Sequence, residues 1–219
     1  MKSNRDFFEK RIGSSFHYQN YWMDGYAWNI RLRLFFKNIN VEKKNILDFG
    51  AGDGLWDKIL LEKGASFVAG IEQSKNLAQN CLVPCHCGLQ TFKMKYDLII
   101  AITSLNFTLP KERDKTIEFL SDHLKQDGRF VILDYLPSKV PNFQKKLEYK
   151  EVWTNVQWNK FMRKHGFVLK KEVPINWVDT TLFHYFGSNR LVYYITSLLD
   201  LLTPIMIYSK YKLQIYKKK

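Results

Sequence analysis

The sequence has few residues of the kinds that cross-link or divide a chain. Its three cysteines are an odd number that does not suit a disulfide framework, so reduced thiols are expected. No stretch rich in proline, glycine or serine separates two halves and no internal repeat is visible, so we expect one domain. The first residues lack the apolar run of a secretory signal, which favours the cytoplasm.

Acidic residues are also scarce. The sequence has 21 Asp and Glu against 34 Lys and Arg, which gives a formal net charge of +13 at pH 7. Such an excess predicts an anionic partner, which is a nucleic acid, a membrane surface, or an acidic saccharide or lipid. The alternative interpretation is a lysine-rich background composition that only keeps the protein soluble.

The most informative stretch is residues 45–54, NILDFGAGDG. Its apolar residues predict a buried strand, and the three glycines follow where a tight turn must lead into a helix over 55–63. Glycines there permit positive φ and let a ligand approach the main chain without meeting a Cβ atom. The stretch therefore predicts a ligand site between a strand and a helix.

The next apolar run, residues 68–72, ends in Glu72. A carboxylate at the end of a second parallel strand can accept hydrogen bonds from both ribose hydroxyls of an adenosine. The glycines follow G-x-G-x-G, which is neither the G-x-G-x-x-G of dinucleotide enzymes nor the phosphate-loop pattern. Asp48 and Asp53 lie in and beside the turn, where they would repel a pyrophosphate and suit a cationic ligand.

At these residues the sequence resembles the class I S-adenosylmethionine-dependent methyltransferases, a broad family that includes many small-molecule and saccharide methyltransferases. Four motifs match in order, at residues 47–54, 70–74, 96–101 and 124–133. The resemblance implies an α/β fold with a Rossmann-like seven-stranded, mostly parallel sheet and an antiparallel last strand. It also implies S-adenosylmethionine as the cofactor.

The resemblance divides the single domain, residues 1–219, into four parts. They are an N-terminal helical cap (1–40), a Rossmann-like core (41–176), a helical insertion (177–208), and the last strand with a basic tail (209–219). Residues 212–216 are the candidate for the last strand, so the largely apolar helix expected over 190–208 precedes it as an insertion.

The resemblance implies cofactor-binding residues in the glycine turn and at the strand ends. They are Asp48, Gly50, Ala51, Gly52, Glu72, Gln73, Gln90 and Ser104. Many family members bind the adenine amino group with an acid after the third strand. Gln90 is the residue available there, and its side-chain carbonyl can accept the same hydrogen bond.

Acceptor-binding candidates are four N-terminal aromatic residues and one amide after the fourth strand: Tyr18, Tyr21, Trp22, Tyr26 and Asn106. Aromatic faces attract a sulfonium cation, although these rings have an alternative role in packing the N-terminal helices onto the sheet. Catalytic candidates are Asp134, Tyr135 and His184, which can orient an acceptor or take its proton. A solvated acid at the strand end is the alternative interpretation of Asp134, and His165 has no acidic partner nearby in sequence.

Local patterns predict three further helices. Ser74 is a candidate N-cap for a helix over 75–80, and Pro110 begins a helix that Gly128 ends. A helix over 149–164 is expected to bury Trp153, Val156, Phe161 and Met162. The cysteines at 81, 85 and 87 coincide with the third strand, where alternate side chains point to opposite faces, so no metal site is expected.

We therefore predict a methyltransferase acting on an oxygen or nitrogen of a small molecule or saccharide, with anionic or lipid-linked acceptors included. RNA methylation is an alternative, although no [NDS]-P-P-[YF] signature of base-nitrogen enzymes follows the fourth strand. A non-catalytic, membrane-associated S-adenosylmethionine-binding protein is another. The helix over 190–208 can serve as a substrate lid, a homodimer surface or, with basic residues of 187–219 such as Lys212, a peripheral membrane contact.

Overall fold

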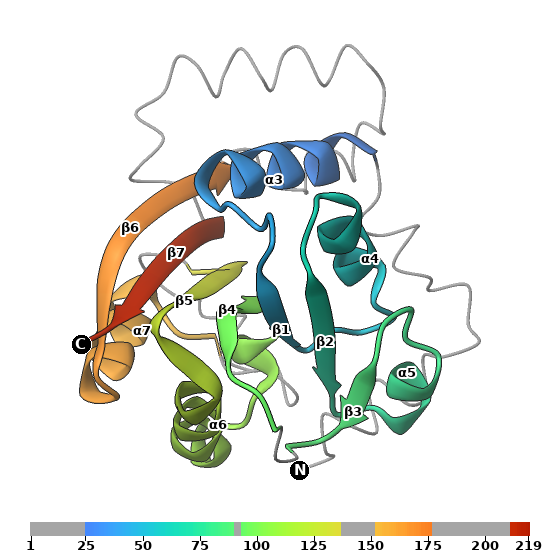
Figure 1. The fold of residues 1–219 in the computed structure, drawn as a ribbon. Coiled ribbons are helices and arrows are strands. Elements are labelled where there is room, and N and C mark those ends of the chain that lie inside the picture. The colour runs from blue at the N-terminus through green and yellow to red at the C-terminus, as the bar shows by residue number, and fades with distance from the viewer. Residues whose placement is uncertain (1–24, 90–92, 137–151, 177–210) are drawn as a thin grey trace.

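The computed structural model describes residues 25–89, 93–136, 152–176 and 211–219 (Figure 1). These residues form a seven-stranded sheet in the order β3-β2-β1-β4-β5-β7-β6. The strands are β1 (Asn45–Phe49), β2 (Phe67–Glu72), β3 (Cys85–Cys87), β4 (Tyr96–Ile102), β5 (Leu124–Tyr135), β6 (Phe167–Asn176) and β7 (Tyr211–Lys218).

β7 lies between β5 and β6 and runs antiparallel to both, whereas β1, β2, β3, β4 and β5 pair in parallel. This confirms the predicted Rossmann-like sheet with an antiparallel last strand. The described helices are α3 (Gly25–Asn38), α4 (Leu55–Glu62), α5 (Lys75–Gln79), the 3-10 helix η1 (Leu105–Phe107), α6 (Pro110–His123) and α7 (Asn155–Lys164).

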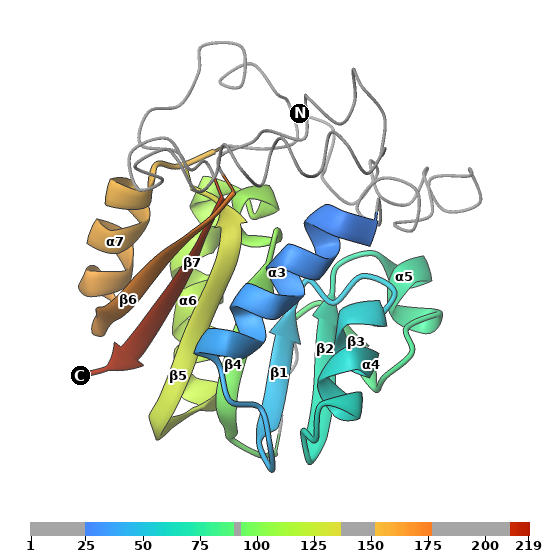
Figure 2. The ribbon, with the colours of Figure 1, turned by 90° about the horizontal axis from the view of Figure 1, so that it is seen from above.

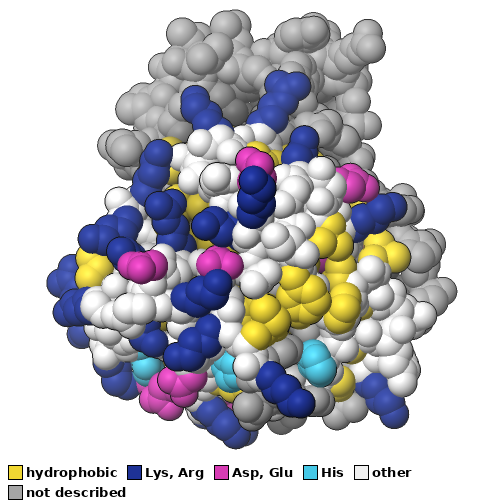
Figure 3. All heavy atoms as spheres, in the orientation of Figure 1, with side chains coloured by type: hydrophobic (Ala, Val, Ile, Leu, Met, Phe, Trp, Pro, Cys, Tyr) yellow, Lys and Arg dark blue, Asp and Glu magenta, His cyan; other side chains and the backbone are white. Residues whose placement is uncertain are grey.

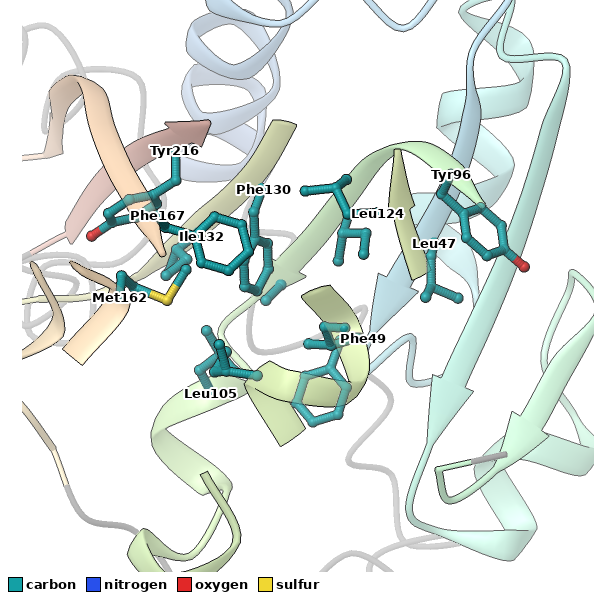
Figure 4. Close-up of a cluster of buried hydrophobic side chains, with 14 of the residues drawn as sticks. Leu47, Phe49, Tyr96, Leu105, Leu124, Phe130, Ile132, Met162, Phe167 and Tyr216 are labelled. Atoms are coloured by element: carbon teal, nitrogen blue, oxygen red, sulfur yellow. The ribbon is translucent and has the colours of Figure 1, made fainter. Parts of the chain in front are cut away.

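The helices lie in two layers. Figure 2 shows α3 and α4 on one face of the sheet and α6 and α7 on the other. One hydrophobic cluster joins Phe35 of α3 and Leu60 of α4 to the sheet. The second joins Leu120 of α6 and Met162 of α7 to the opposite face (Figure 4). Because helices cover both faces, parallel strands such as β1 and β2 are buried along nearly their whole length.

The predicted cap of α5 is confirmed, since the Ser74 hydroxyl accepts a hydrogen bond from the N–H of Leu77. The predicted end of α6 is wrong. This helix ends at His123, and Gly128 lies inside β5. A Cβ on Gly128 would come within 2.6 Å of Leu124 Cδ1. The glycine therefore serves close packing at an irregularity, where the register between β4 and β5 shifts.

The predicted inner face of α7 is partly wrong. Val156 is 68% exposed, whereas Trp158 is fully buried beside Met162. The reason is the start of the helix. Thr154 and Gln157 form a capping box, so α7 begins at Asn155 and its faces are set from there.

The predicted last strand over 212–216 is confirmed, since β7 covers Tyr211–Lys218. Lys212 is 3% exposed and its Nζ lies 3.1 Å from Glu172 Oε1, so this lysine is paired inside the sheet. The predicted insertion, with His184, lies outside the described residues, as do residues 1–24. Within the described part, no helix is long and apolar enough to cross a bilayer.

Candidate functional site

The glycine turn, residues 50–54, has a left-handed backbone at each of its glycines. φ is 84° at Gly50, 60° at Gly52 and 76° at Gly54, a region that other L-residues rarely adopt. The N–H of Gly50 donates to the carbonyl of Ile71 at 2.7 Å. The end of β2 therefore holds the turn in place.

The space around the turn differs from glycine to glycine. A Cβ on Gly50 would lie 2.3 Å from the Cβ of Ser104, and one on Gly54 would lie 2.6 Å from Cys81 Sγ. A Cβ on Gly52 would meet no heavy atom of the described structure within 4 Å. Among the three glycines of the turn, Gly52 therefore leaves the most room beside its main chain within the described structure.

Glu72 is anchored against this turn. Its carboxylate accepts a hydrogen bond from the N–H of Gly52 at 3.0 Å through Oε2, and from the N–H of Ser74 at 2.9 Å through Oε1. The side chain is 9% exposed. Each carboxylate oxygen has two lone pairs, so this carboxylate can hold the turn and still accept hydrogen bonds from a ligand with two hydroxyls.

The hydroxyl of Ser104 is a polar group without a partner among the described residues. Its hydroxyl is buried and makes no hydrogen bond within the described structure. The hydroxyl oxygen would lie 3.1 Å from a Cβ on Gly50, which places it against the glycine turn. A buried hydroxyl usually finds a partner, and a bound ligand would supply one here.

Behind the turn, Asp48 of β1 faces Asp57 of α4, and both are buried, at 2% and 0% exposure. Neither Asp48 Oδ1 nor either oxygen of Asp57 receives a hydrogen bond from a donor group in the described structure. A hydrogen bond between the two carboxyl groups therefore requires a shared proton. Burial, followed by the charge of Asp57, raises the pKa of Asp48 well above its ordinary value, and burial raises the pKa of Asp57 to about 7.

Sequence reasoning missed Asp57. The available signal was its position in the first turn of α4 between Trp56 and Leu60, both of which are buried. An acid on the apolar side of a helix is unusual unless it has a partner. In the first turn it also meets the positive end of the helix dipole.

Two thiols lie beside the glycine turn. The Cys85 thiol hydrogen-bonds the sulfur of Cys81, which lowers the pKa of Cys81, while the same hydrogen bond and burial raise that of Cys85. The Cys81 sulfur contacts the Gly54 position and the Cys85 sulfur the Gly70 position. Over the described residues, no group of three His, Cys, Asp or Glu side chains is placed to hold a metal ion.

At the end of β4, Asn106 is fully buried and bonded to the protein itself. Its Oδ1 accepts hydrogen bonds from the N–H of Trp153 and from Trp158 Nε1, both at 3.2 Å. Its main-chain N–H donates to Asp134 Oδ2 at 3.4 Å. Asp134, at the end of β5, is 1% exposed. The structure therefore brings these two predicted site residues together as a packed unit.

Arg113, which sequence reasoning did not identify, stacks on this unit. Its guanidinium carbon lies 4.0 Å from the ring centroid of Trp153 and 5.1 Å from that of Trp158. Its Nε donates to the carbonyl of Thr108 at 3.0 Å. The arginine is fully buried. No local sequence pattern indicates it, because the two tryptophans that it stacks on lie in α7 or just before it.

The other predicted site residues are placed as follows. Ala51 is buried in the turn and its N–H donates to Ile71 at 3.2 Å, and Gln73 is exposed just after β2. Tyr26 lies in α3 and Tyr135 at the end of β5, but their side chains are not described. Outside the described residues lie Tyr18, Tyr21, Trp22, Gln90 and His184.

His165 has the acidic partner that its sequence neighbourhood lacks. Its Nε2 lies 2.9 Å from Asp114 Oδ1 of α6. The residue stands between α7 and the start of β6. β6 is antiparallel to β7, as β5 is, so it runs parallel to β5 and begins at the edge of the sheet opposite the glycine turn. This pair therefore belongs to the packing of α6 against α7.

Two comparisons with known proteins agree with this geometry. A family model described as a methyltransferase domain matches residues 18–172. No curated protein matches the chain significantly. Among solved structures, the complex between the Haloferax volcanii Trm112 methyltransferase activator and a methyltransferase gives a TM-score of 0.70 at 14% identity, covering 98% of this chain and 96% of that one.

Two further structures are similar and have ligands in their descriptions. The Burkholderia thailandensis 1,6-didemethyltoxoflavin-N1-methyltransferase, with that substrate and S-adenosylhomocysteine, gives a TM-score of 0.61 at 16% identity, covering 98% of this chain and 88% of that one. A Brevibacillus brevis polyketide synthase O-methyltransferase, with S-adenosylhomocysteine, gives 0.63 at 15% identity, covering 94% and 80%. At these identities the likeness shows the fold.

Proposed function

Because this chain belongs to the methyltransferase-domain family and S-adenosylmethionine is its methyl donor, we propose that it methylates an oxygen or nitrogen of a small molecule or saccharide. The main support for the proposed S-adenosylmethionine site is the arrangement of Gly52, Glu72 and Ser104. Within the described structure, a glycine with no heavy atom near its Cβ position, an anchored carboxylate and a buried hydroxyl without a partner converge on one turn.

The residues proposed to hold the donor fit its chemistry. Glu72 would accept hydrogen bonds from the ribose hydroxyls, and Gly50 and Gly52 would let the methionine part approach the main chain. The negative pair behind the turn would attract a cation. Bound S-adenosylmethionine supplies an electrophilic methyl group on a sulfonium whose sulfur leaves as a neutral thioether. Ala51, Gln73 and Gln90 complete the proposed donor site.

The acceptor half acts mainly by positioning. Methyl transfer is a displacement in line with the leaving sulfur, so correct placement of the acceptor supplies much of the acceleration. Asp134 is buried and already accepts a hydrogen bond from the Asn106 N–H. We therefore propose that Asp134 helps to orient the acceptor molecule. Tyr135, His184 and the N-terminal rings are the remaining candidates for contact with the acceptor or its proton.

Two observations favour a small acceptor. The segment after β4 lacks a base-nitrogen signature, and the amide oxygen of its Asn106 is occupied by two tryptophan donors. Of the two similar proteins with ligands, one is described as a 1,6-didemethyltoxoflavin methyltransferase. The other is described as an O-methyltransferase of a polyketide synthase. Basic side chains predominate among the charged groups of the face shown in Figure 3, which favours acceptors carrying negative charge.

The test is transfer of a labelled methyl group from S-adenosylmethionine. The purified protein would be incubated with small-metabolite and lipid-linked saccharide fractions and, in parallel, with total RNA. Label in a small molecule, absent with Glu72→Gln, is the expected result. Label in RNA alone would contradict the small-acceptor proposal while leaving the donor site intact. The exposed Glu118→Gln variant on α6 is the control for loss of one carboxylate.

A further inference from the structure

The carboxyl pair behind the glycine turn is the least compensated group in the described structure. Asp48 and Asp57 are almost completely buried, and three of their four oxygens receive no hydrogen bond from an N–H or O–H group in the described residues. The residues between them in sequence form the glycine turn itself. The pair therefore lies directly under the site proposed for the donor.

Among the described residues, the ionisable groups acting on this pair come from four elements, and none of them adds positive charge. They are Asp57 of α4 and Asp53 of the turn, Glu72 of β2, and Cys81 before β3, which act on Asp48 or Asp57. From α3, the aromatic rings of Phe35 and Phe36 pack on Trp56 beside the pair. Two adjacent buried carboxylates cannot both ionise cheaply in such surroundings.

We propose that Asp48 and Asp57 share one proton in the unliganded protein and release it to solvent when S-adenosylmethionine binds. A buried cation nearby favours the charged form of an acid and is screened little by salt. The donor carries a sulfonium charge that the product, S-adenosylhomocysteine, has lost. The pair therefore makes the affinity for donor rise with pH more steeply than the affinity for product.

This assignment makes Asp57 a positioning residue that helps the site distinguish donor from product by charge. After methyl transfer the sulfur is neutral, and the pair takes up a proton again. This uptake weakens the electrostatic attraction for the ligand that must leave. The inference rests on the proposed donor site. It explains how that site would distinguish S-adenosylmethionine from S-adenosylhomocysteine.

The experiment counts protons rather than turnover. S-adenosylmethionine and S-adenosylhomocysteine would be titrated calorimetrically into the protein at pH 7 in two buffers, one with low and one with high ionisation enthalpy. The difference between buffers gives the number of protons released. We expect up to about one proton more per bound donor than per bound product. Equal counts for the two ligands would overturn the inference, whereas binding of neither would instead contradict the proposed donor site.

Variants assign the released proton to the pair. Asp57→Asn removes one partner with little change in shape and should abolish the difference between the two ligands, and Asp48→Asn is the second variant. Glu62→Gln, an exposed acid on the same helix, should retain it. An unchanged difference in both folded pair variants would overturn the assignment.

A measurement without ligand tests the shared proton directly. The pKa of Asp57 is raised to about 7 in the folded protein, so between its ordinary value and 7 the folded state binds more protons than the unfolded state. The midpoint of urea unfolding should therefore fall as pH rises from about 4 to about 7 more steeply in wild type than in Asp57→Asn. Parallel curves for the two proteins would overturn the proposal.

Discussion

Two regions at the same edge of the sheet use their polar groups in different ways. At the ends of β1 and β2, Glu72 bonds to the main chain of the glycine turn, a Cβ on Gly52 would meet no described heavy atom within 4 Å, and the Ser104 hydroxyl has no partner in the described structure. At the ends of β4 and β5, Asn106 bonds to Asp134 and to the buried Trp158. The first region is the one that we propose for the donor, and the second is packed as a core.

This difference explains how one fold can keep its donor and change its acceptor. In the proposed function, donor recognition depends on main-chain conformation, which the three left-handed glycines set. Asn106, Trp158 and Arg113 form a packed unit. We therefore propose that other segments supply the groups that contact the acceptor, with the N-terminal rings and His184 as candidates.

The largest effect is expected when the turn itself is broken. Gly50→Ala would force a Cβ to 2.3 Å from the Ser104 Cβ at a φ of 84°. A left-handed side chain costs roughly 1–2 kcal/mol and overpacking about 1–3 kcal/mol more. We expect a loss of about 3 kcal/mol in the free energy of unfolding, measured by urea denaturation, together with loss of donor binding. Wild-type stability would contradict the described packing of the turn.

Asn106→Ala tests the packed region and should have the next largest effect. It leaves the N–H of Trp153 and Trp158 Nε1 without their acceptor, and each buried donor costs about 1–3 kcal/mol when unpaired. We expect destabilisation of about 2 kcal/mol in urea. Affinity of the folded variant for S-adenosylhomocysteine should be unchanged.

Asn80→Ala is the control for that experiment, because Asn80 is exposed and, within the described residues, its amide donates only to the carbonyl of Asn76. Its unfolding free energy should match wild type closely. A loss of product affinity in Asn106→Ala would show that the two regions are coupled rather than independent.

Gly52→Ala should affect stability least and binding strongly. No heavy atom of the described structure lies within 4 Å of the new Cβ, so only the strain at a φ of 60° remains, about 1 kcal/mol. The same methyl group would occupy the space proposed for the ligand. We expect at least about a tenfold loss of donor affinity by calorimetry. Normal binding would place the ligand elsewhere.

Much of the sheet could be predicted because its determinants are local. The apolar run before Gly50, the glycine turn and the Ser74 cap all act within a few residues of their own position. The antiparallel last strand followed from the resemblance. The helix predicted over 149–164 begins later than expected, at Asn155, although Thr154 and Gln157 have the spacing of a capping box.

What could not be predicted depends on contacts between distant segments. Gly128 was expected to end a helix, but its role is set by the Leu124 side chain and the register with β4. The roles of Asp57 and His165 follow from their contacts with Asp48 and Asp114, which are distant in sequence or lie on another element. Pairs of this kind appear when the chain is folded, because no local period or motif marks both partners.

Calorimetric titration of S-adenosylhomocysteine is the direct test of the proposed donor site formed by Glu72 and the glycine turn. Hydrogen bonds to a charged group contribute about 1.5–3 kcal/mol each. We therefore expect Glu72→Ala to lower the affinity by at least about tenfold and Glu118→Ala to leave it unchanged. Equal affinity in wild type and folded Glu72→Ala would contradict the proposed donor site.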